Sequence, residues 1–165
     1  MTTTTTELPE VDFDRLDRED DEGRWLLDGA PFTGVATEHD GGVRISLSGF
    51  EEGYPHGPER EWSPRGTLLT ERYYRDAALH GPSRHWSADG TPEADSWFER
   101  GVCTRRSRWG QGGWQPNDYT PTPREQERLA AKRAGGDAPL VELASDGGTW
   151  RFREVPFADP GPPER

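Results

Sequence analysis

The sequence predicts a mainly all-β protein, in which an elongated, single-layer antiparallel sheet of repeated β-hairpins is followed by a short helix and a terminal hairpin. Three observations predict this fold. Residues 57–74 and 81–98 can be superimposed without a gap, 24 residues apart. Glycines recur between short segments rich in aromatic and β-branched residues, which favour strands. Only 30% of the residues are hydrophobic, too few for a thick two-layer core.

The repeat unit reads His-Gly-Pro-x-x-x-Trp-x-x-x-Gly and continues to an aromatic pair. The first clear copy begins at His56 and reaches Tyr73-Tyr74, and the second begins at His80 and reaches Trp97-Phe98. A fixed period of roughly 20–50 residues is typical of small units stacked side by side. Degraded copies upstream and downstream extend the array, as expected for end units that face water.

Within each unit, the glycines predict hairpin turns and the aromatic residues predict the core. Gly42, Gly66 and Gly90 can supply the positive φ of a tight turn. Pro58 and Pro82 suit the first residue of a strand, where no ladder donor is needed. Two strands per unit advance the array by roughly 10 Å. Five rings are then expected to stack into one longitudinal spine, namely Phe50, Trp62, Tyr74, Trp86 and Phe98.

The flanking segments differ from the array in composition. Residues 7–24 hold nine acidic against three basic residues. Thr122-Pro123 is a good helix start, and Ser145–Gly148 between two apolar runs predicts a hairpin. The C-terminal piece either caps the array or forms a small appendage. The expected organisation is an acidic, partly disordered segment (1–24), the hairpin array (25–114), a linker (115–123), a short helix plus hairpin cap (124–157) and a loose tail (158–165).

Residues 28–110 resemble the MORN-type repeats of the YwqK-like group, often labelled a toxin–antitoxin antitoxin family. The motifs that carry the resemblance are Asp28-Gly-Ala-Pro-Phe-Thr-Gly34, His56-Gly-Pro-x-Arg-Glu-Trp62, Tyr73-Tyr74 and Arg105-Arg-Ser-Arg-Trp109. The chain departs from the pattern at Ala77, where glycine occupies the equivalent positions 53 and 101. The resemblance implies an open, single-layer sheet of hairpins and an antitoxin-like role, although a fold alone does not fix a function.

Composition limits the function classes. The net charge of −11 argues against nucleic acid as the main ligand, because phosphate binding requires a basic footprint. No stretch approaches the length of a membrane span, and no signal-peptide pattern is present. Cys103 is the only cysteine, so no intrachain disulfide can form. These features predict a cytoplasmic protein without a cofactor. The strong preference for arginine over lysine is typical of a GC-rich bacterial source.

The histidines of the repeat have a structural and a chemical interpretation. His56 and His80 share a phase, so they should lie on one edge roughly 10 Å apart. We expect each of them to cap a turn before its Gly-Pro. No ligand spacing typical of zinc is present, so no metal site is predicted. If the protein is an enzyme, His56 and His80 would converge with Arg84 and Glu61 in a closed pocket.

Arginine and tryptophan supply the candidate binding residues. Arg60 and Arg84 share a phase and either bind a carboxylate-bearing partner or pair with neighbouring glutamates. The cluster Arg105, Arg106 and Arg108 either contacts an anionic partner or pairs with the acidic N-terminal segment. Trp114 lies outside the repeat and is typical of an interface hot spot.

Two functions remain open. The first is a non-catalytic interaction module, antitoxin- or immunity-like, that binds a basic partner protein through its repeat face and acidic flank. The second is a small-molecule enzyme or ligand-binding protein of specialised metabolism that uses the concave aromatic face of the array. No nucleophile motif or phosphate loop supports the second, and Cys103 has no base adjacent in sequence.

Overall fold

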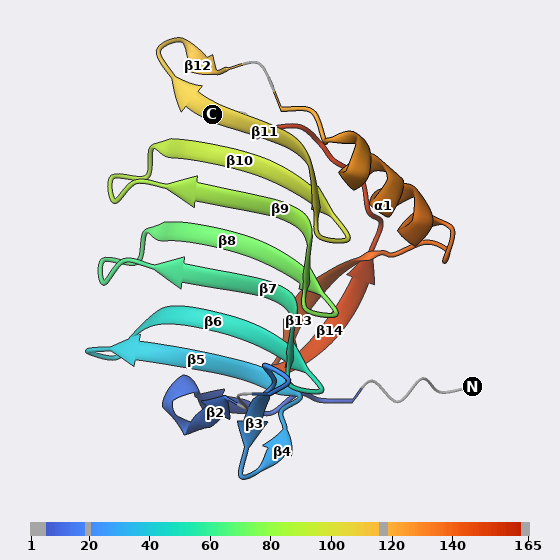
Figure 1. Ribbon diagram of the computed structural model, residues 1–165. Helices are drawn as coiled ribbons and strands as arrows, with labels where there is room; N and C mark the ends of the chain where they lie inside the picture. Colours follow the sequence, from blue (N-terminus) through green and yellow to red (C-terminus); the bar gives the residue numbers. More distant parts are fainter. Residues whose placement is uncertain (1–5, 19–20, 116–118, 163–165) are drawn as a thin grey trace.

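The long sheet of hairpins predicted from the sequence is confirmed. The structure, a computed structural model, describes residues 6–18, 21–115 and 119–162. Its main element is a nine-stranded sheet in which every strand from β5 onward lies beside its neighbour in sequence (Figure 1). The strands of this sheet are β1 (Glu10–Asp12), β5 (Gly34–Asp40), β6 (Val43–Glu51), β7 (Tyr54–Trp62), β8 (Leu68–Arg75), β9 (Ala78–Trp86), β10 (Pro92–Glu99), β11 (Val102–Gly110) and β12 (Gly113–Trp114).

A small separate sheet beside the first hairpin combines residues 16–18 of the acidic segment with residues 25–31, which the sequence analysis assigns to the array. A 3-10 helix (Phe13–Arg15) follows β1, and the strands β2 (Leu16–Arg18), β3 (Trp25–Leu27) and β4 (Ala30–Pro31) pair in that order. Its apolar side chains pack around Phe50 of β6. β1 pairs with β5 in parallel, so the long sheet is mixed rather than purely antiparallel as the sequence predicts. Residues 1–5, where disorder is predicted, lie outside the described residues.

The turns along one edge of the sheet are bonded to the preceding unit. Asp76 and Ala77, like Arg100 and Gly101, have positive φ at both central positions, which is typical of a type I′ turn. The backbone N–H of Asp76 donates to Nδ1 of His56 at 3.2 Å, and that of Arg100 donates to Nδ1 of His80 at 2.9 Å. Each histidine therefore caps the turn of the following hairpin, not a turn before its own Gly-Pro.

The His-Gly-Pro motif forms a bulge in the middle of a strand. Between β6 and β7 the register moves from Ser48↔Glu59 to Phe50↔Pro55, so the strand carrying the motif has two extra residues. The bulge between β8 and β9 has the same size. Gly57 and Gly81 adopt φ of 81° and 120° within these bulges. The prolines after them are therefore mid-strand, not first in the strand as predicted, at a place where the ladder is already interrupted.

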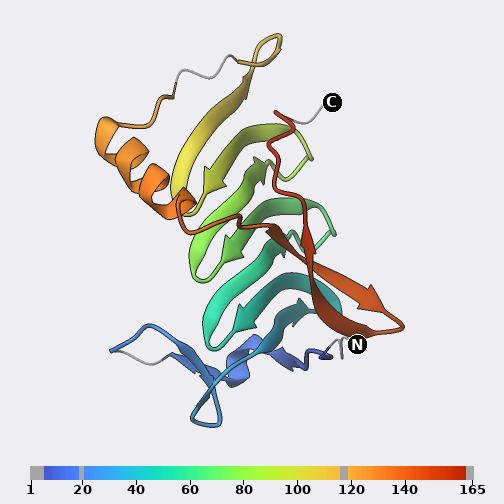
Figure 2. The same ribbon diagram turned by 90° about the vertical axis from the view of Figure 1, so that its right-hand side faces the viewer.

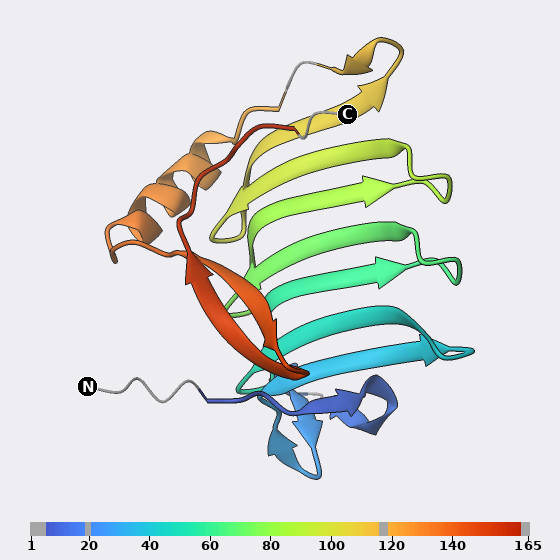
Figure 3. The same ribbon diagram turned by 180° about the vertical axis from the view of Figure 1, so that it is seen from behind.

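The C-terminal segment covers one face of the sheet, which we call the covered face. Strands β13 (Leu140–Asp146) and β14 (Thr149–Val155) form the predicted hairpin and cross this face over β7 and β8 (Figures 2 and 3). Leu140 packs on Gly81, where a Cβ added to the glycine would lie 2.4 Å from the leucine side chain. Leu143 joins a core with Leu8, Val35 and Leu47. The hairpin thus caps a face of the array rather than its end.

The predicted helix is present as α1 (Pro123–Arg133). Thr122 is the N-cap: its hydroxyl accepts from the backbone of Glu125, and the Glu125 carboxylate accepts from the Thr122 N–H, a complete capping box. The helix lies along the turn edge of the upper hairpins (Figure 1). Arg133 pairs with Glu99, and the Lys132 ammonium donates to the Arg100 carbonyl oxygen at 2.8 Å. These contacts fix the helix against the turn between β10 and β11.

The single aromatic spine predicted from the sequence is wrong. Phe50 belongs to a cluster with Leu16, Phe32 and Ala36, whereas Trp62 packs against the cluster on the covered face. Phe50 lies on the same side of the sheet as Glu59 and Glu61 of β7, so the alternation of side chains along β7 directs Trp62 to the opposite side. The aromatic residues therefore build two cores on opposite faces of one sheet.

Ala77 provides a test of the turn geometry. Its φ of 68° strains a residue that carries a Cβ, whereas glycine occupies the equivalent positions 53 and 101. We expect Ala77→Gly to raise the free energy of unfolding by about 1 kcal/mol, measured by urea denaturation.

Ala88→Gly is the matched control, because Ala88 lies in a turn on the other edge and has no positive φ. It should leave stability unchanged or lower it slightly. A destabilised Ala77→Gly variant would contradict the assignment of strain to this turn.

Candidate functional site

The candidate residues fall on two opposite faces of the sheet. Successive side chains of a strand point to opposite faces, so Arg60 and Glu61 diverge. Arg60 and Arg84 lie on the covered face, where both contact Glu71 of β8. Glu61 lies on the other side, which we call the open face, and accepts a hydrogen bond from Thr70. The predicted convergence of Glu61 with His56, His80 and Arg84 in one pocket is therefore wrong.

Arg60 and Arg84 belong to a row of alternating charges across the covered face, which we call the charged row. Glu71 bridges Arg60 and Arg84 at 2.7 and 3.3 Å. Asp95 bridges Arg84 and Arg105 at 2.9 and 2.6 Å, and its side chain is fully buried. Between its two ends the row thus alternates three arginines with two carboxylates.

Both ends of the charged row are closed by the C-terminal segment. At one end, Glu142 of β13 lies 3.1 Å from the Arg60 guanidinium and accepts from the Tyr73 hydroxyl at 2.9 Å. At the other end, Asp159 accepts two hydrogen bonds from Arg105 at 2.7 and 2.9 Å. Asp159 lies in the segment expected to be a loose tail, so this part of the tail is docked. Arg60 and Arg84 therefore pair with neighbouring carboxylates, one of the two alternatives that the sequence leaves open. Arg105 pairs with Asp95 and Asp159, not with the acidic N-terminal segment.

Burial and hydrogen bonding raise the pKa values of two groups at the Arg60 end of the row. Burial raises the pKa of the Tyr73 phenol, and the nearby Glu71 carboxylate raises it further, so the hydroxyl remains a neutral donor. Burial alone would lower the pKa of Arg60, but its hydrogen bond to Glu71 and the surrounding carboxylates raise it overall. Arg60 therefore keeps its charge at neutral pH, and every arginine of the row has two carboxylate partners within the chain.

The two histidines are fixed in one tautomer. Because Nδ1 accepts a backbone N–H, the neutral ring carries its proton on Nε2. In His80, Nε2 lies 2.7 Å from the Ala138 carbonyl oxygen, to which it donates. Burial lowers the pKa of both His56 and His80, which favours the neutral, capping form. These rings are structural caps rather than general bases.

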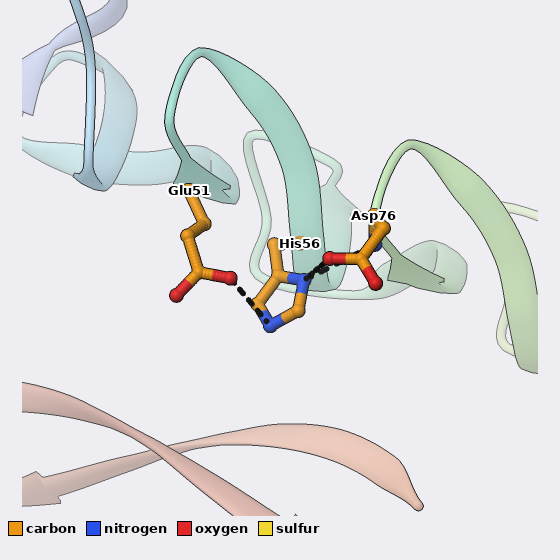
Figure 4. A group of neighbouring side chains, drawn as sticks. All are labelled: Glu51, His56 and Asp76. Atoms are coloured by element: carbon orange, nitrogen blue, oxygen red, sulfur yellow. Dashed lines mark hydrogen bonds and ion pairs between the residues drawn. The ribbon is translucent and has the colours of Figure 1, made fainter. Parts of the chain in front are cut away.

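His56 also lies between two carboxylates, an arrangement that resembles a metal site (Figure 4). Glu51 approaches Nε2 at 3.4 Å and Asp76 approaches Nδ1 at 3.6 Å, from opposite sides of the ring. A metal ion bound here would need one ring nitrogen and both carboxylates around it, but the two carboxylates approach different nitrogens. Nδ1, moreover, already accepts the hydrogen bond from the Asp76 N–H. The geometry fits a capped imidazole and does not fit a chelate.

The remaining candidates occupy the far end of the array. The guanidinium of Arg106 lies 4.8 Å from the ring centre of Tyr119, and Trp114 makes an edge contact with Trp109 at 5.3 Å. Arg108 is exposed on β11. The acidic N-terminal segment packs at β5 and β6, at the opposite end of the sheet from this cluster. Cys103 is buried, and burial raises the pKa of its thiol, which is unfavourable for a nucleophile.

The open face carries a pocket that the sequence analysis did not anticipate. Its volume is about 280 Å³, and strands β5, β6 and β7 form its floor. Three carboxylates line it, from Glu38, Glu59 and Glu61. Rings of Phe13, Trp25 and Phe50 form its wall, with Phe13 and Trp25 in edge contact at 4.8 Å. Carboxylates beside aromatic faces suit a cationic group. The pocket joins the acidic N-terminal segment to the repeat array.

Comparison of the chain with protein-family models, curated proteins and solved structures gives no match. Within the described residues, no helix has the length and apolar character that a membrane span requires.

The charged row yields a stability prediction. Arg84→Met should lower the free energy of unfolding by about 3 kcal/mol, because it leaves the fully buried Asp95 with one partner fewer. Arg72→Met is the matched control: Arg72 pairs with Glu59 on the open face, where both side chains are more exposed, and should cost less than about 1 kcal/mol. Equal losses in urea denaturation would contradict a special role for the row.

The histidine caps yield a pH prediction. His80 has a folded-state pKa below its unfolded value of about 6.5, so the unfolded chain binds more protons below that pH. The contribution of this cap to stability is complete above about pH 6.5 and should decline as the pH falls below that value. His80→Asn keeps an acceptor for the Arg100 N–H but cannot titrate, so its unfolding free energy should change less over this range. An unchanged pH slope would contradict the neutral cap.

Proposed function

We propose that the protein is a non-catalytic interaction module that binds a basic partner protein through the open face of its sheet. The observation that carries the proposal is the pocket with Glu38, Glu59 and Glu61 against an aromatic wall. Its volume of about 280 Å³ can hold a lysine or arginine side chain, whose charge can meet the carboxylates while its stem lies along the rings. The net charge of −11 would steer such a partner toward the protein.

The arrangement of the faces supports the open face as the binding surface. On the covered face, the C-terminal hairpin and tail already occupy the sheet, and the arginines there are paired. On the open face, Glu38 and Glu61 are exposed and accept hydrogen bonds from the hydroxyl groups of Ser46 and Thr70. Carboxylates held by neutral donors keep their charge available to an incoming cation.

The resemblance to YwqK-like repeats gives this proposal a more specific form. An antitoxin- or immunity-like protein would neutralise a basic toxin, such as a nuclease, in the cytoplasm. An acidic pocket on a rigid sheet fits this role, because the charged side chains of such a partner would be held without a large conformational change. Co-expression with the cognate toxin should relieve toxicity, and a variant that lacks the pocket carboxylates of Glu38 and Glu61 should not.

The pocket is tested with an octa-arginine peptide as the probe of a basic partner. The double variant Glu38→Gln/Glu61→Gln should weaken binding at least about tenfold, because Glu59, the third pocket carboxylate, is already paired with Arg72 at 3.0 Å. Binding is measured by titration calorimetry and by the change in tryptophan fluorescence, to which Trp25 in the pocket wall contributes.

Glu7→Gln/Glu127→Gln is the control, since both residues are exposed and the net charge changes equally. Equal weakening in both double variants would show that only the overall charge attracts the peptide, and the proposed site would be wrong.

A further inference from the structure

The C-terminal residues 157–159 are held on the covered face by two side chains. The Phe157 ring stacks on His80 with a centroid distance of 4.0 Å and an interplanar angle of 12°. It also contacts Trp97 at 5.1 Å. Two positions further on, Asp159 accepts two hydrogen bonds from Arg105. An aromatic ring and a carboxylate separated by one residue therefore form a two-point anchor.

The surface beneath this anchor is rigid and specific. Trp97 and His80 are buried, and the Nδ1 cap and the Nε2 hydrogen bond fix the histidine ring. Arg105 is held from below by Asp95, at 2.6 Å, and its side chain is only 14% exposed. Planar guanidinium groups select carboxylates through paired hydrogen bonds. The sheet thus presents an aromatic surface, formed by His80 and Trp97 and called the aromatic shelf below, at a fixed distance from the oriented guanidinium of Arg105.

The two ends of the charged row differ in how their carboxylates are held. Glu142 belongs to β13, whose backbone is paired with β14 along seven residues. Asp159 lies beyond the last strand, in a stretch that has neither strand nor helix from Pro156 to Pro162. Its side chain is 27% exposed. The carboxylate at the Arg105 end can therefore leave without breaking a sheet, whereas Glu142 cannot.

We propose that His80, Trp97 and Arg105 form a recognition site for a partner segment that carries an aromatic residue followed, two positions later, by a carboxylate. Residues 157–159 occupy this site within the chain and are displaced when the partner segment binds. The partner chemistry is read from the occupant: a ring for the shelf and a carboxylate for the guanidinium. This site is independent of the acidic pocket, since it lies on the other face and has the opposite charge preference.

Because residues 157–159 are attached to the chain, they compete with any partner segment for the site. A short flexible tether gives its end group an effective concentration in the millimolar range. Removing the tail should therefore strengthen the binding of a free segment by about tenfold or more. This difference between truncated and full-length chains separates a displaceable occupant from a permanent part of the fold.

The test uses a chain ending at Val155 and a synthetic peptide of residues 156–162. The peptide should bind the truncated chain saturably, and the full-length chain at least about tenfold more weakly, in titration calorimetry. Peptides with Phe157→Ala or Asp159→Asn should each bind at least about tenfold more weakly than the parent peptide. An unrelated peptide that keeps only the aromatic-x-carboxylate pattern should bind as well, because the pattern alone is recognised.

The proposal is wrong if the folded truncated chain binds the parent and Asp159→Asn peptides equally, or binds neither at millimolar concentration. Circular dichroism checks that the truncated chain is folded. If it is not, the full-length double variant Phe157→Ala/Asp159→Asn replaces it, because its weakened tail should let the parent peptide bind more tightly than to the unaltered chain. No gain in affinity for that variant overturns the proposal.

Discussion

The array depends on how the backbone N–H groups of each turn are hydrogen-bonded. A type I′ turn directs two donors toward the preceding unit, and buried backbone donors must be satisfied. Ala77 and Gly101 donate to the carbonyl oxygens of Pro55 and Leu79, at 3.0 and 2.7 Å. The residues before them donate to the two histidine rings. At the first hairpin, the Glu52 N–H donates instead to the Thr33 hydroxyl at 2.9 Å. Each hairpin is thus positioned by the side chain of its predecessor, which explains why the histidine recurs with the period.

The same constraint determines where the C-terminal segment packs. To cap the next turn, the histidine must leave the regular strand path, and the bulge at His-Gly-Pro provides this displacement. The bulge needs glycine, and the missing side chain opens room for a neighbour: Phe152 packs on Gly57 as Leu140 does on Gly81. Phe152 also meets the edge of His56 at 4.9 Å, as Phe157 stacks on His80. Docking of this segment shields the charged row from water and supplies the carboxylates of Glu142 and Asp159 at its two ends.

The sequence could reveal what repeats, but not what breaks the period. The hairpins, the helix start at Thr122 and the common phase of Arg60 and Arg84 are local or periodic signals, and the structure contains all of them. By phase, Arg108 should be the third arginine of the row. The bulge between β10 and β11 is one residue shorter than its counterparts, which turns Arg108 to the other face and leaves Arg105 to pair with Asp95. The contacts of Glu142 and Asp159 with the row cannot be predicted for another reason. Both residues lie outside the repeat, and periodicity carries no information on tertiary contacts.

The distribution of charge gives the two faces different chemistry. Three of the arginines are committed to the charged row, where each carboxylate has a guanidinium partner. The pocket between β5 and β7 instead gathers the carboxylates of Glu38, Glu59 and Glu61 beside aromatic rings. If Asp159 leaves, Arg105 at the end of the row can accept another carboxylate, whereas the pocket suits a cation. Because a single sheet separates them, the two proposed sites would select partner segments of opposite charge.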